Sequence, residues 1–354
     1  MKPGDIVPNG LYFNLPEEIY HADPDALGST ALKGLVVDPV EWQFDNLYEE
    51  DKDTEALIFG SALHLRMLEG RAAFERRFCE AYVPDLSGDV LVTKHDLTAW
   101  LKEHGQTGLS ALRKDDLCRR VLELDPDQRI EEVERRTHAE ETEGKTELKA
   151  RRWGQINVAC RWVQRDPLLS AVMEDGTFIE GAPEVSIFYE DNGVRLKARL
   201  DRMLRHAIVD LKSFAPWWRK RIQIQVVEVL ERMNYDLQAA AYLRAWDHAK
   251  QAYADGTLAV FGDEPVPGFL DQAFDRDEPK WIWVMIKSRG APQPLVVDWR
   301  AEIAKATAGR EIDTAIETYR DLVAEFGRDQ DWPPRHAALE LFDTDLPTWW
   351  GTKR

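Results

Sequence analysis

The chain has 354 residues, a hydrophobic content of 44% and a formal net charge of −18 at pH 7. This composition is typical of a globular protein with a sizeable core, and no apolar run reaches the roughly 18 residues that a membrane span needs. The N-terminal residues contain no apolar signal core, so we expect a cytoplasmic protein. Cys79, Cys118 and Cys160 are far apart and form no CxxC pair, which argues against a zinc ribbon, an iron–sulfur cluster or a disulfide framework.

The first half of the chain is predicted to be mostly helical. Two short helices are expected within residues 17–49, with Ser29 and Thr30 as candidate caps and a break at Pro39. A helix over residues 54–69 follows, since its apolar residues recur with helical spacing up to Gly70. Residues 150–175 are expected to form a core helix.

Residues 85–149 differ in character from their surroundings. Within them, residues 91–124 predict two short amphipathic helices around a bend that contains glycine. Residues 125–149 are mostly charged and polar, and are interpreted as an exposed helix or connector. We therefore assign residues 1–84 and 150–354 to the core and residues 91–124 to an insertion.

After Gly176 the apolar period falls to two. Residues 183–214 predict three strands, with turns at "EDNG" and at Arg205-His206. A helical region over residues 222–250, strands in "KWIWVMIKS" and "PLVVDW", and a helix over residues 299–326 complete the pattern. This order indicates an α/β domain with a mixed central sheet flanked by helices.

The positive charge is concentrated near the predicted hairpin. Nine Lys or Arg residues lie between positions 195 and 221, against only Asp201 and Asp210. A basic strip on an acidic body can steer a polyanion to one place, although a solvated strand face would give the same pattern. The candidate DNA contacts in this strip are Arg195, Lys197, Arg199, Arg219, Lys220 and Arg221.

The hairpin also suggests a metal site. A two-residue turn at Arg205-His206 would place Asp201 directly opposite Asp210, and two such carboxylates repel unless a proton or a cation separates them. Magnesium prefers carboxylate oxygens, water and phosphate. Lys212 lies on the same strand face as Asp210 and could position or deprotonate a metal-held water. This arrangement suits metal-assisted phosphodiester hydrolysis; a solvated hairpin with chance charges is the alternative.

These residues resemble a known pattern. Asp201, a short gap and "Asp210-Leu211-Lys212" resemble the split motif of PD-(D/E)xK nucleases, and "YDLQAAAYLRAW", with Gln238 and Tyr242, resembles the following helix of the RecB/RecE-like branch. "GSALHLRMLEG", with His64, and "PEVSIFYED" before "KARLDRM", with Glu184, are similar to other segments of that branch. The resemblance covers most of the chain outside residues 85–149.

The resemblance implies a restriction-endonuclease-like core and a role for each motif residue. His64, Asp201, Asp210 and the Leu211 carbonyl would hold Mg²⁺, for which Mn²⁺ can substitute, and Glu184 would hold a second metal or a water. Lys212 would activate the nucleophile, while Gln238 and Tyr242 would support the site or hold the strand end.

The same resemblance implies an exonuclease that resects linear double-stranded DNA from 5′ to 3′ and leaves 3′ single strands for recombination. A single-strand annealing protein would be its partner, a ring-shaped homo-oligomer its assembly, and a phage or prophage in a bacterial cell its source. Two alternatives remain open. One is a non-catalytic DNA-binding scaffold, and the other is a RecB-type or CRISPR-adaptation-type nuclease of different polarity, although the chain lacks the four clustered cysteines of the latter's iron–sulfur cluster.

Residues 91–124 are similar to a SAP-type helix–extended–helix module, a small DNA-binding unit. This resemblance implies phosphate contacts from Lys94, Arg113, Lys114 and Arg119. An ordinary helical hairpin inserted into the core is the alternative.

Overall fold

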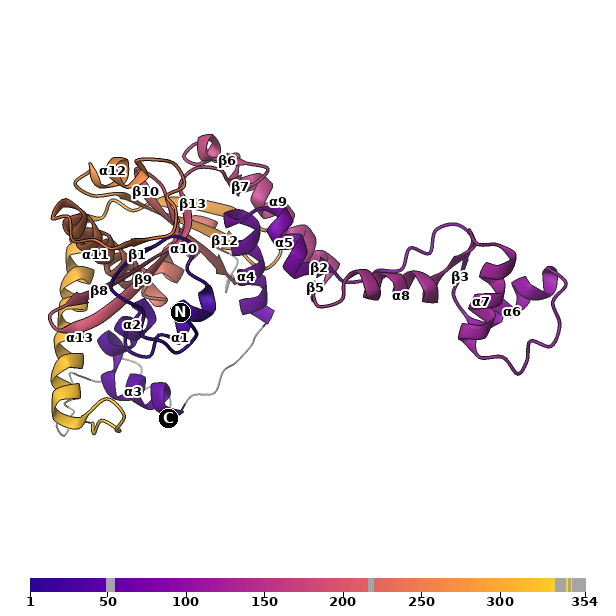
Figure 1. Ribbon diagram of the computed structural model, residues 1–354, viewed down its shortest axis with the longest axis horizontal. Helices are drawn as coiled ribbons and strands as arrows, with labels where there is room; N and C mark the ends of the chain where they lie inside the picture. The colour runs from indigo at the N-terminus through magenta and orange to yellow at the C-terminus, as the bar shows by residue number, and fades with distance from the viewer. Residues whose placement is uncertain (49–54, 216–219, 335–341, 343–344, 346–354) are drawn as a thin grey trace.

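A seven-stranded mixed sheet forms the centre of the protein, in the order β11-β1-β8-β9-β10-β12-β13 (Figure 1). The computed structural model describes residues 1–48, 55–215, 220–334, 342 and 345. The strands of this sheet are β1 (Gly10–Tyr12), β8 (Ala182–Asp191), β9 (Val194–Met203), β10 (Ala207–Phe214), β11 (Val260–Phe261), β12 (Lys280–Lys287) and β13 (Pro294–Asp298). Both hairpin connections fall where the sequence predicts them.

The middle of the sheet is buried on both faces. β10 and β12 run parallel over their full length, as expected of strands covered on two sides. Along β12, Trp281 and Trp283 point into one hydrophobic cluster, while Ile282 and Val284 point into the other. The alternation of strand side chains therefore divides the core into two layers.

Helices cover both faces of this sheet. One face packs against α2 (Ser29–Val37), α10 (Ile222–Arg232), α11 (Tyr235–Ala254), α12 (Phe269–Phe274) and α13 (Glu302–Phe326). The other face packs against α4 (Glu55–Leu68), α5 (Arg71–Arg77) and α9 (Ala150–Val163). The smaller elements around this core are α1 (Glu17–Ala22), α3 (Pro39–Tyr48), the 3-10 turn η1 (Ser170–Val172) and the strand pair β6 (Met173–Glu174) and β7 (Thr177–Phe178).

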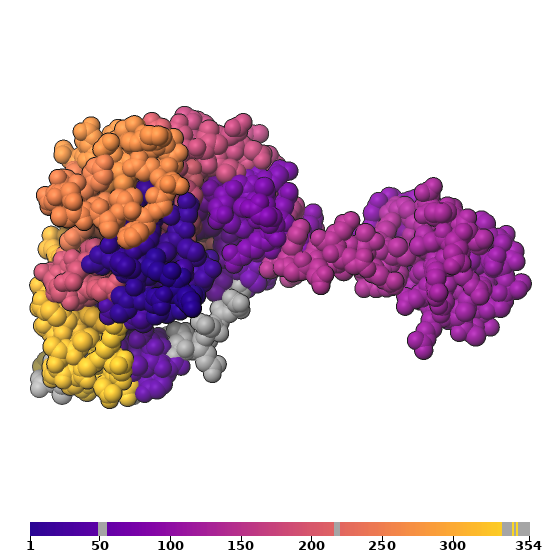
Figure 2. Space-filling view, viewed as in Figure 1, coloured from indigo at the N-terminus to yellow at the C-terminus, as the bar shows by residue number. Residues whose placement is uncertain are grey.

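Residues 81–145 project from this body as an arm (Figures 1 and 2). Its base is the parallel pair β2 (Phe78–Glu80) and β5 (Thr146–Leu148). The arm contains β3 (Val90–Leu91), α6 (Lys94–Glu103), α7 (Lys114–Leu124), β4 (Arg129–Ile130) and α8 (Glu131–Glu141). Leu97, Leu101, Leu117 and Val121 are fully buried in a hydrophobic cluster made only of arm residues. The tip of the arm thus has a core of its own.

The α/β mixed sheet is confirmed, and three helix predictions need correction. The core helix expected over residues 150–175 ends at Val163, and η1 and β6 occupy the last part of that range. Residues 17–48 form three helices instead of two, and α2 begins after Gly28 with no side-chain cap, so the capping role of Ser29 and Thr30 is wrong. The helical region after residue 222 is broken between α10 and α11 at Asn234, whose φ of 48° is left-handed. Asn adopts that conformation more readily than most residues. Among the described residues, no helix is long and apolar enough to cross a membrane.

Candidate active site

The candidate site forms where β9 and β10 separate. Their ladder contains the predicted pairs Met203–Ile208 and Arg202–Val209 and then ends. The next predicted pair, Asp201 opposite Asp210, does not form, because Asp201 Oδ2 instead accepts a hydrogen bond of 2.7 Å from the backbone N–H of Leu211. The side chain of Asp201 thus takes the place of a β9 backbone carbonyl as the acceptor for Leu211, and the ladder between β9 and β10 is interrupted here.

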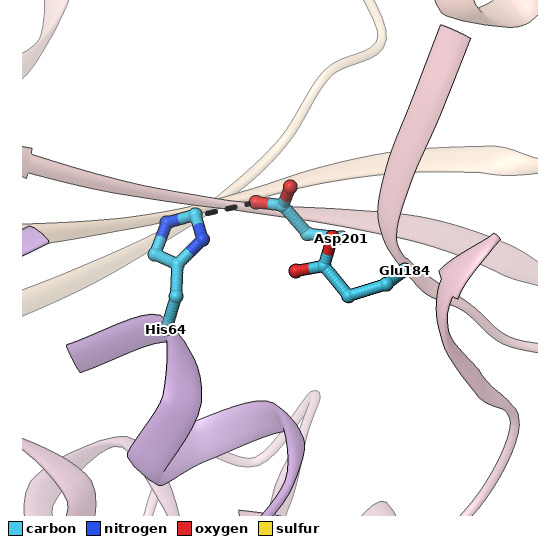
Figure 3. A group of neighbouring side chains, drawn as sticks. All are labelled: His64, Glu184 and Asp201. Atoms are coloured by element: carbon cyan, nitrogen blue, oxygen red, sulfur yellow. Dashed lines mark ion pairs between the residues drawn. The ribbon is translucent and has the colours of Figure 1, made fainter. Parts of the chain in front are cut away.

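Three ligand-type side chains converge at this opening. His64 comes from α4, Glu184 from β8 and Asp201 from β9 (Figure 3), and one ligand atom of each lies within 4.8 Å of the others. His64 Nε2 is 3.8 Å from Asp201 Oδ2 and 2.9 Å from the carbonyl oxygen of Leu211. Imidazole, carboxylate and carbonyl groups together make a donor set suited to a small divalent cation.

Glu184 is held in place by Arg199. Burial and the neighbouring Asp201 raise the pKa of Glu184, while its ion pair with Arg199 opposes that shift. Arg199 also donates to the carbonyl of Leu15 at 2.9 Å and to Ser186 Oγ at 3.1 Å. The φ of Glu184 is 52°, a conformation that costs about 1–3 kcal/mol for a non-glycine residue. The arginine therefore fixes a strained acid at the cluster.

Asp210 and Lys212 form a buried pair beside this cluster. Asp210 is 1% exposed, and its Oδ1 accepts from Lys212 Nζ at 2.8 Å. Its Oδ2 is buried with no hydrogen-bond partner, which is costly for a carboxylate oxygen. Burial raises the pKa of Asp210 to about 6, against the opposing effect of Lys212. A cation would satisfy the unpartnered oxygen, so the residues fit a metal.

Lys212 is a protonated amine before any metal binds. Burial alone would lower its pKa, but Asp210 and Asp201 outweigh burial and raise the pKa above its ordinary value. The Nζ also lies 5.3 Å from the centre of the Tyr235 ring, which is within cation–π distance. The structure therefore provides Lys212 with a carboxylate, an aromatic ring and a fixed orientation.

One face of α11 forms a wall of the site. Gln238 Nε2 donates to Asp210 Oδ1 at 3.3 Å. Tyr242, one turn later, is 8% exposed and has a hydrogen bond with Ser29 of α2. Burial raises the pKa of Tyr242 to about 12, so its hydroxyl stays neutral. A groove of about 450 Å³ lies next to this wall, with Ser29, Lys197 and Tyr242 among its lining residues.

The candidate DNA contacts on β9 have partners within the protein. Arg195 forms an ion pair with Asp25 at 2.9 Å, and Lys197 Nζ donates to the Tyr20 carbonyl at 2.8 Å. Arg199 belongs to the Glu184 ion pair. Near α10, Lys220 pairs with Glu228 and Arg221 is exposed, whereas Arg219 lies outside the described residues. Of this strip, Lys197 lines the groove beside the site.

The arm bases divide into two kinds. Lys114 pairs with Glu132 at 3.2 Å, and Arg119 pairs with Asp116. Lys94 and Arg113 are exposed at the N-terminal ends of α6 and α7. DNA binding by these four residues stays a prediction.

Sequence reasoning missed two residues that help to build the site. The sequence predicts that Arg199, two residues before Asp201, belongs to a DNA-binding strip. It predicts that Ser29 caps the N-terminus of a helix. The alternation of residues along β9 does not indicate which acid Arg199 pairs with, because that acid, Glu184, lies on the neighbouring strand β8. The contact between Ser29 and Tyr242 likewise depends on how two distant helices pack.

A comparison with protein-family models matches residues 41–261, which is more than half of the chain, to the PDDEXK-like domain of unknown function (DUF3799). The chain belongs to this PDDEXK-like family. Its fold is accordingly of the PD-(D/E)xK type, and this fold suggests a nuclease. No curated protein matches the sequence significantly.

Among solved structures, one of a candidate exonuclease from Eubacterium rectale is similar at 14% sequence identity and a TM-score of 0.43, with 87% of each chain covered. PD-(D/E)xK nucleases usually use divalent metals. The cluster of His64, Glu184 and Asp201 in this PDDEXK-like protein contains side chains of the types that bind such metals.

Proposed function

We propose that this protein is a magnesium-dependent deoxyribonuclease. The observation that carries the proposal is the unpartnered, buried Oδ2 of Asp210 beside the cluster of His64, Glu184 and Asp201. A protein with only a binding role has no need for several carboxylates close enough to repel one another. A bound divalent cation would relieve that repulsion and attract a phosphodiester.

Each residue of the proposed site has a distinct task. His64, Asp201, Asp210 and the Leu211 carbonyl would hold the metal, and Glu184, fixed by Arg199, would hold a further metal or a water. The metal supplies Lewis-acid activation of the phosphate and of water. Lys212 would orient the attacking water and stabilise negative charge on the phosphate, because its ammonium is held in place by Asp210 and Tyr235. Gln238 and Tyr242 would support Asp210 and the bound strand.

We further propose the substrate and biological setting that the RecE-like resemblance implies. The enzyme would resect linear duplex DNA from 5′ to 3′ and leave 3′ single strands for recombination. A single-strand annealing protein would be its partner, and a ring-shaped homo-oligomer its assembly, in the cytoplasm of a bacterium carrying the phage or prophage. The groove beside Ser29, Lys197 and Tyr242 supports the proposal of a bound strand, because a basic side chain, Lys197, lines it together with Tyr242 of the site wall.

End-labelled linear DNA and closed-circular DNA test this function directly. With Mg²⁺ or Mn²⁺ we expect degradation of the linear duplex, and with Ca²⁺ or EDTA we expect no degradation, since the carboxylates suit a small hard cation. Comparing DNA labelled at the 5′ end with DNA labelled at the 3′ end gives the direction of degradation. Equal digestion of circles would contradict the exonuclease, although not the nuclease. Binding without cleavage in any metal would favour the scaffold alternative.

The arm provides an independent prediction about DNA affinity. We propose that its tip, residues 91–124, is a DNA-binding unit, with Lys94 and Arg113 as its main phosphate contacts. The double variant Lys94→Gln/Arg113→Gln should then flatten the plot of log affinity against log salt by roughly 0.9 per lost contact on duplex DNA. The matched variant Lys114→Gln/Arg119→Gln should flatten it less, because those bases already have acidic partners.

Single-turnover cleavage at saturating enzyme should be unchanged in both arm variants, because the candidate metal site lies in the body. If the slope of log affinity against log salt is the same for the wild-type protein and both variants, the arm does not bind DNA and acts as a spacer.

A further inference from the structure

The faces of α2 and α11 that meet at the site carry a lysine that the proposed function does not use. Ser29 of α2 contacts Tyr242 of α11. One turn further along α2, Lys33 Nζ lies 5.4 Å from the centre of the Tyr235 ring, at the beginning of α11. Lys212 Nζ lies 5.3 Å from the centre of the same ring. The proposed catalytic lysine and a second amine therefore both lie near the same aromatic ring.

Within the part of the chain that the structure describes, Lys33 has a weak acceptor. It is half-buried, and its hydrogen bond to the carbonyl of Met233 measures 3.5 Å, which is at the limit of hydrogen-bond distance. Burial, followed by the repulsion of Lys212, lowers the pKa of Lys33, while Asp210 and Asp236 oppose this shift. A partly buried amine in this situation is stabilised when an anion approaches it.

Two acids of the neighbouring site already have other bases as ion-pair partners. Asp210 is already paired with Lys212, and Glu184 is paired with Arg199. Among the residues that the structure describes, Lys33 forms no ion pair with a carboxylate. A metal at the cluster would be balanced by Asp201 and its neighbours, which would leave Asp236 as the acid that still attracts Lys33.

We propose that Lys33 binds a phosphate of the DNA strand next to the phosphate that is hydrolysed, with Tyr235 keeping its amine at a fixed distance from Lys212. The inference rests on the proposed nuclease function and adds a substrate-contacting residue to it. An ammonium donates well to phosphate oxygens and carries no sequence preference. The contact would fix the position of the strand over the metal site without taking part in bond breaking.

The test measures binding of a linear duplex in Ca²⁺ over a series of salt concentrations. The variants are Lys33→Gln, Lys33→Met and Lys33→Arg. Met preserves most of the aliphatic stem if Gln should disturb folding, and Arg keeps the charge. Lys280→Gln is the matched control, because Lys280 is exposed and pairs with Ala207, at the end of β10 far from Lys212.

We expect the Gln and Met variants to bind about tenfold more weakly at low salt, with a salt slope flatter by roughly 0.9 for one lost contact on duplex DNA, or 0.7 on a single strand. Lys33→Arg and Lys280→Gln should keep the wild-type slope. A lysine with a merely structural role would change thermal stability without changing the slope.

The two possible failures can be told apart. If wild-type protein binds and cuts DNA while the Gln and Met variants keep the wild-type slope, the role of Lys33 is overturned and the nuclease proposal stands. If wild-type protein neither binds nor cuts DNA with any divalent metal, both proposals are overturned.

Discussion

Replacing Asp210 with Asn is expected to lower the cleavage rate by about three orders of magnitude, because a metal ligand contributes several kcal/mol of transition-state stabilisation and each 1.36 kcal/mol is a factor of ten. The neutral amide keeps an oxygen that accepts from Lys212 and Gln238 but provides no charge for a cation. Single-turnover cleavage with saturating Mg²⁺ measures the effect. Calorimetric titration with Mn²⁺ should show weaker metal binding in the same variant.

The stability of the metal-free protein provides the control for Asp210→Asn. The substitution removes a buried carboxylate whose Oδ2 has no partner and whose neighbour Asp201 repels it. Lys212 retains its attraction to Asp201 and the Tyr235 ring. We therefore expect the thermal midpoint without metal to stay level or rise. A large fall would mean that Asp210 is a structural residue, and would contradict its assignment as a ligand.

Replacing Lys212 with Met is expected to remove activity and also to destabilise the protein. Breaking a buried ion pair from one side leaves an uncompensated charge, which costs about 3 kcal/mol or more. Here the charge left behind is Asp210, which is 1% exposed and repelled by a further acid, Asp201. Denaturant unfolding without metal should show the loss as a lower midpoint with an unchanged slope.

The double variant Asp210→Asn/Lys212→Met separates the two roles of Lys212. Because Asp210→Asn removes the uncompensated charge, the double variant should regain much of the free energy of unfolding that Lys212→Met alone loses. Cleavage should stay absent in the double variant. The coupling between the two sites, obtained from the four proteins, should exceed about 1 kcal/mol for side chains in direct contact. Additive effects of the two substitutions on stability would show that the Asp210–Lys212 pair does not have the strength proposed here.

The sequence by itself determined five of the seven strands of the central sheet, most of the helices and the β9–β10 turn, whereas the short strands β1 and β11 were not predicted. Each of the predicted elements follows from local patterning. Val194, Leu196, Ala198 and Leu200 alternate with polar residues on β9, and the run of apolar residues on β12 predicts a strand buried on both sides. The predicted hairpin indicates Asp201, the resemblance adds His64 and Glu184, and the structure brings the three side chains together. Their roles in catalysis stay a prediction.

Only the tertiary structure decided how the charges of the site are paired. The sequence predicts Asp201 directly opposite Asp210, but in the structure the Asp201 carboxylate accepts a hydrogen bond from the backbone N–H of Leu211. Arg199 of β9 pairs with Glu184 of the neighbouring strand β8, and Lys33 reaches the Tyr235 ring from another helix. Local periodicity determines which face a side chain occupies. Its partner depends on the packing of segments that are distant in the sequence, and no local pattern encodes that packing.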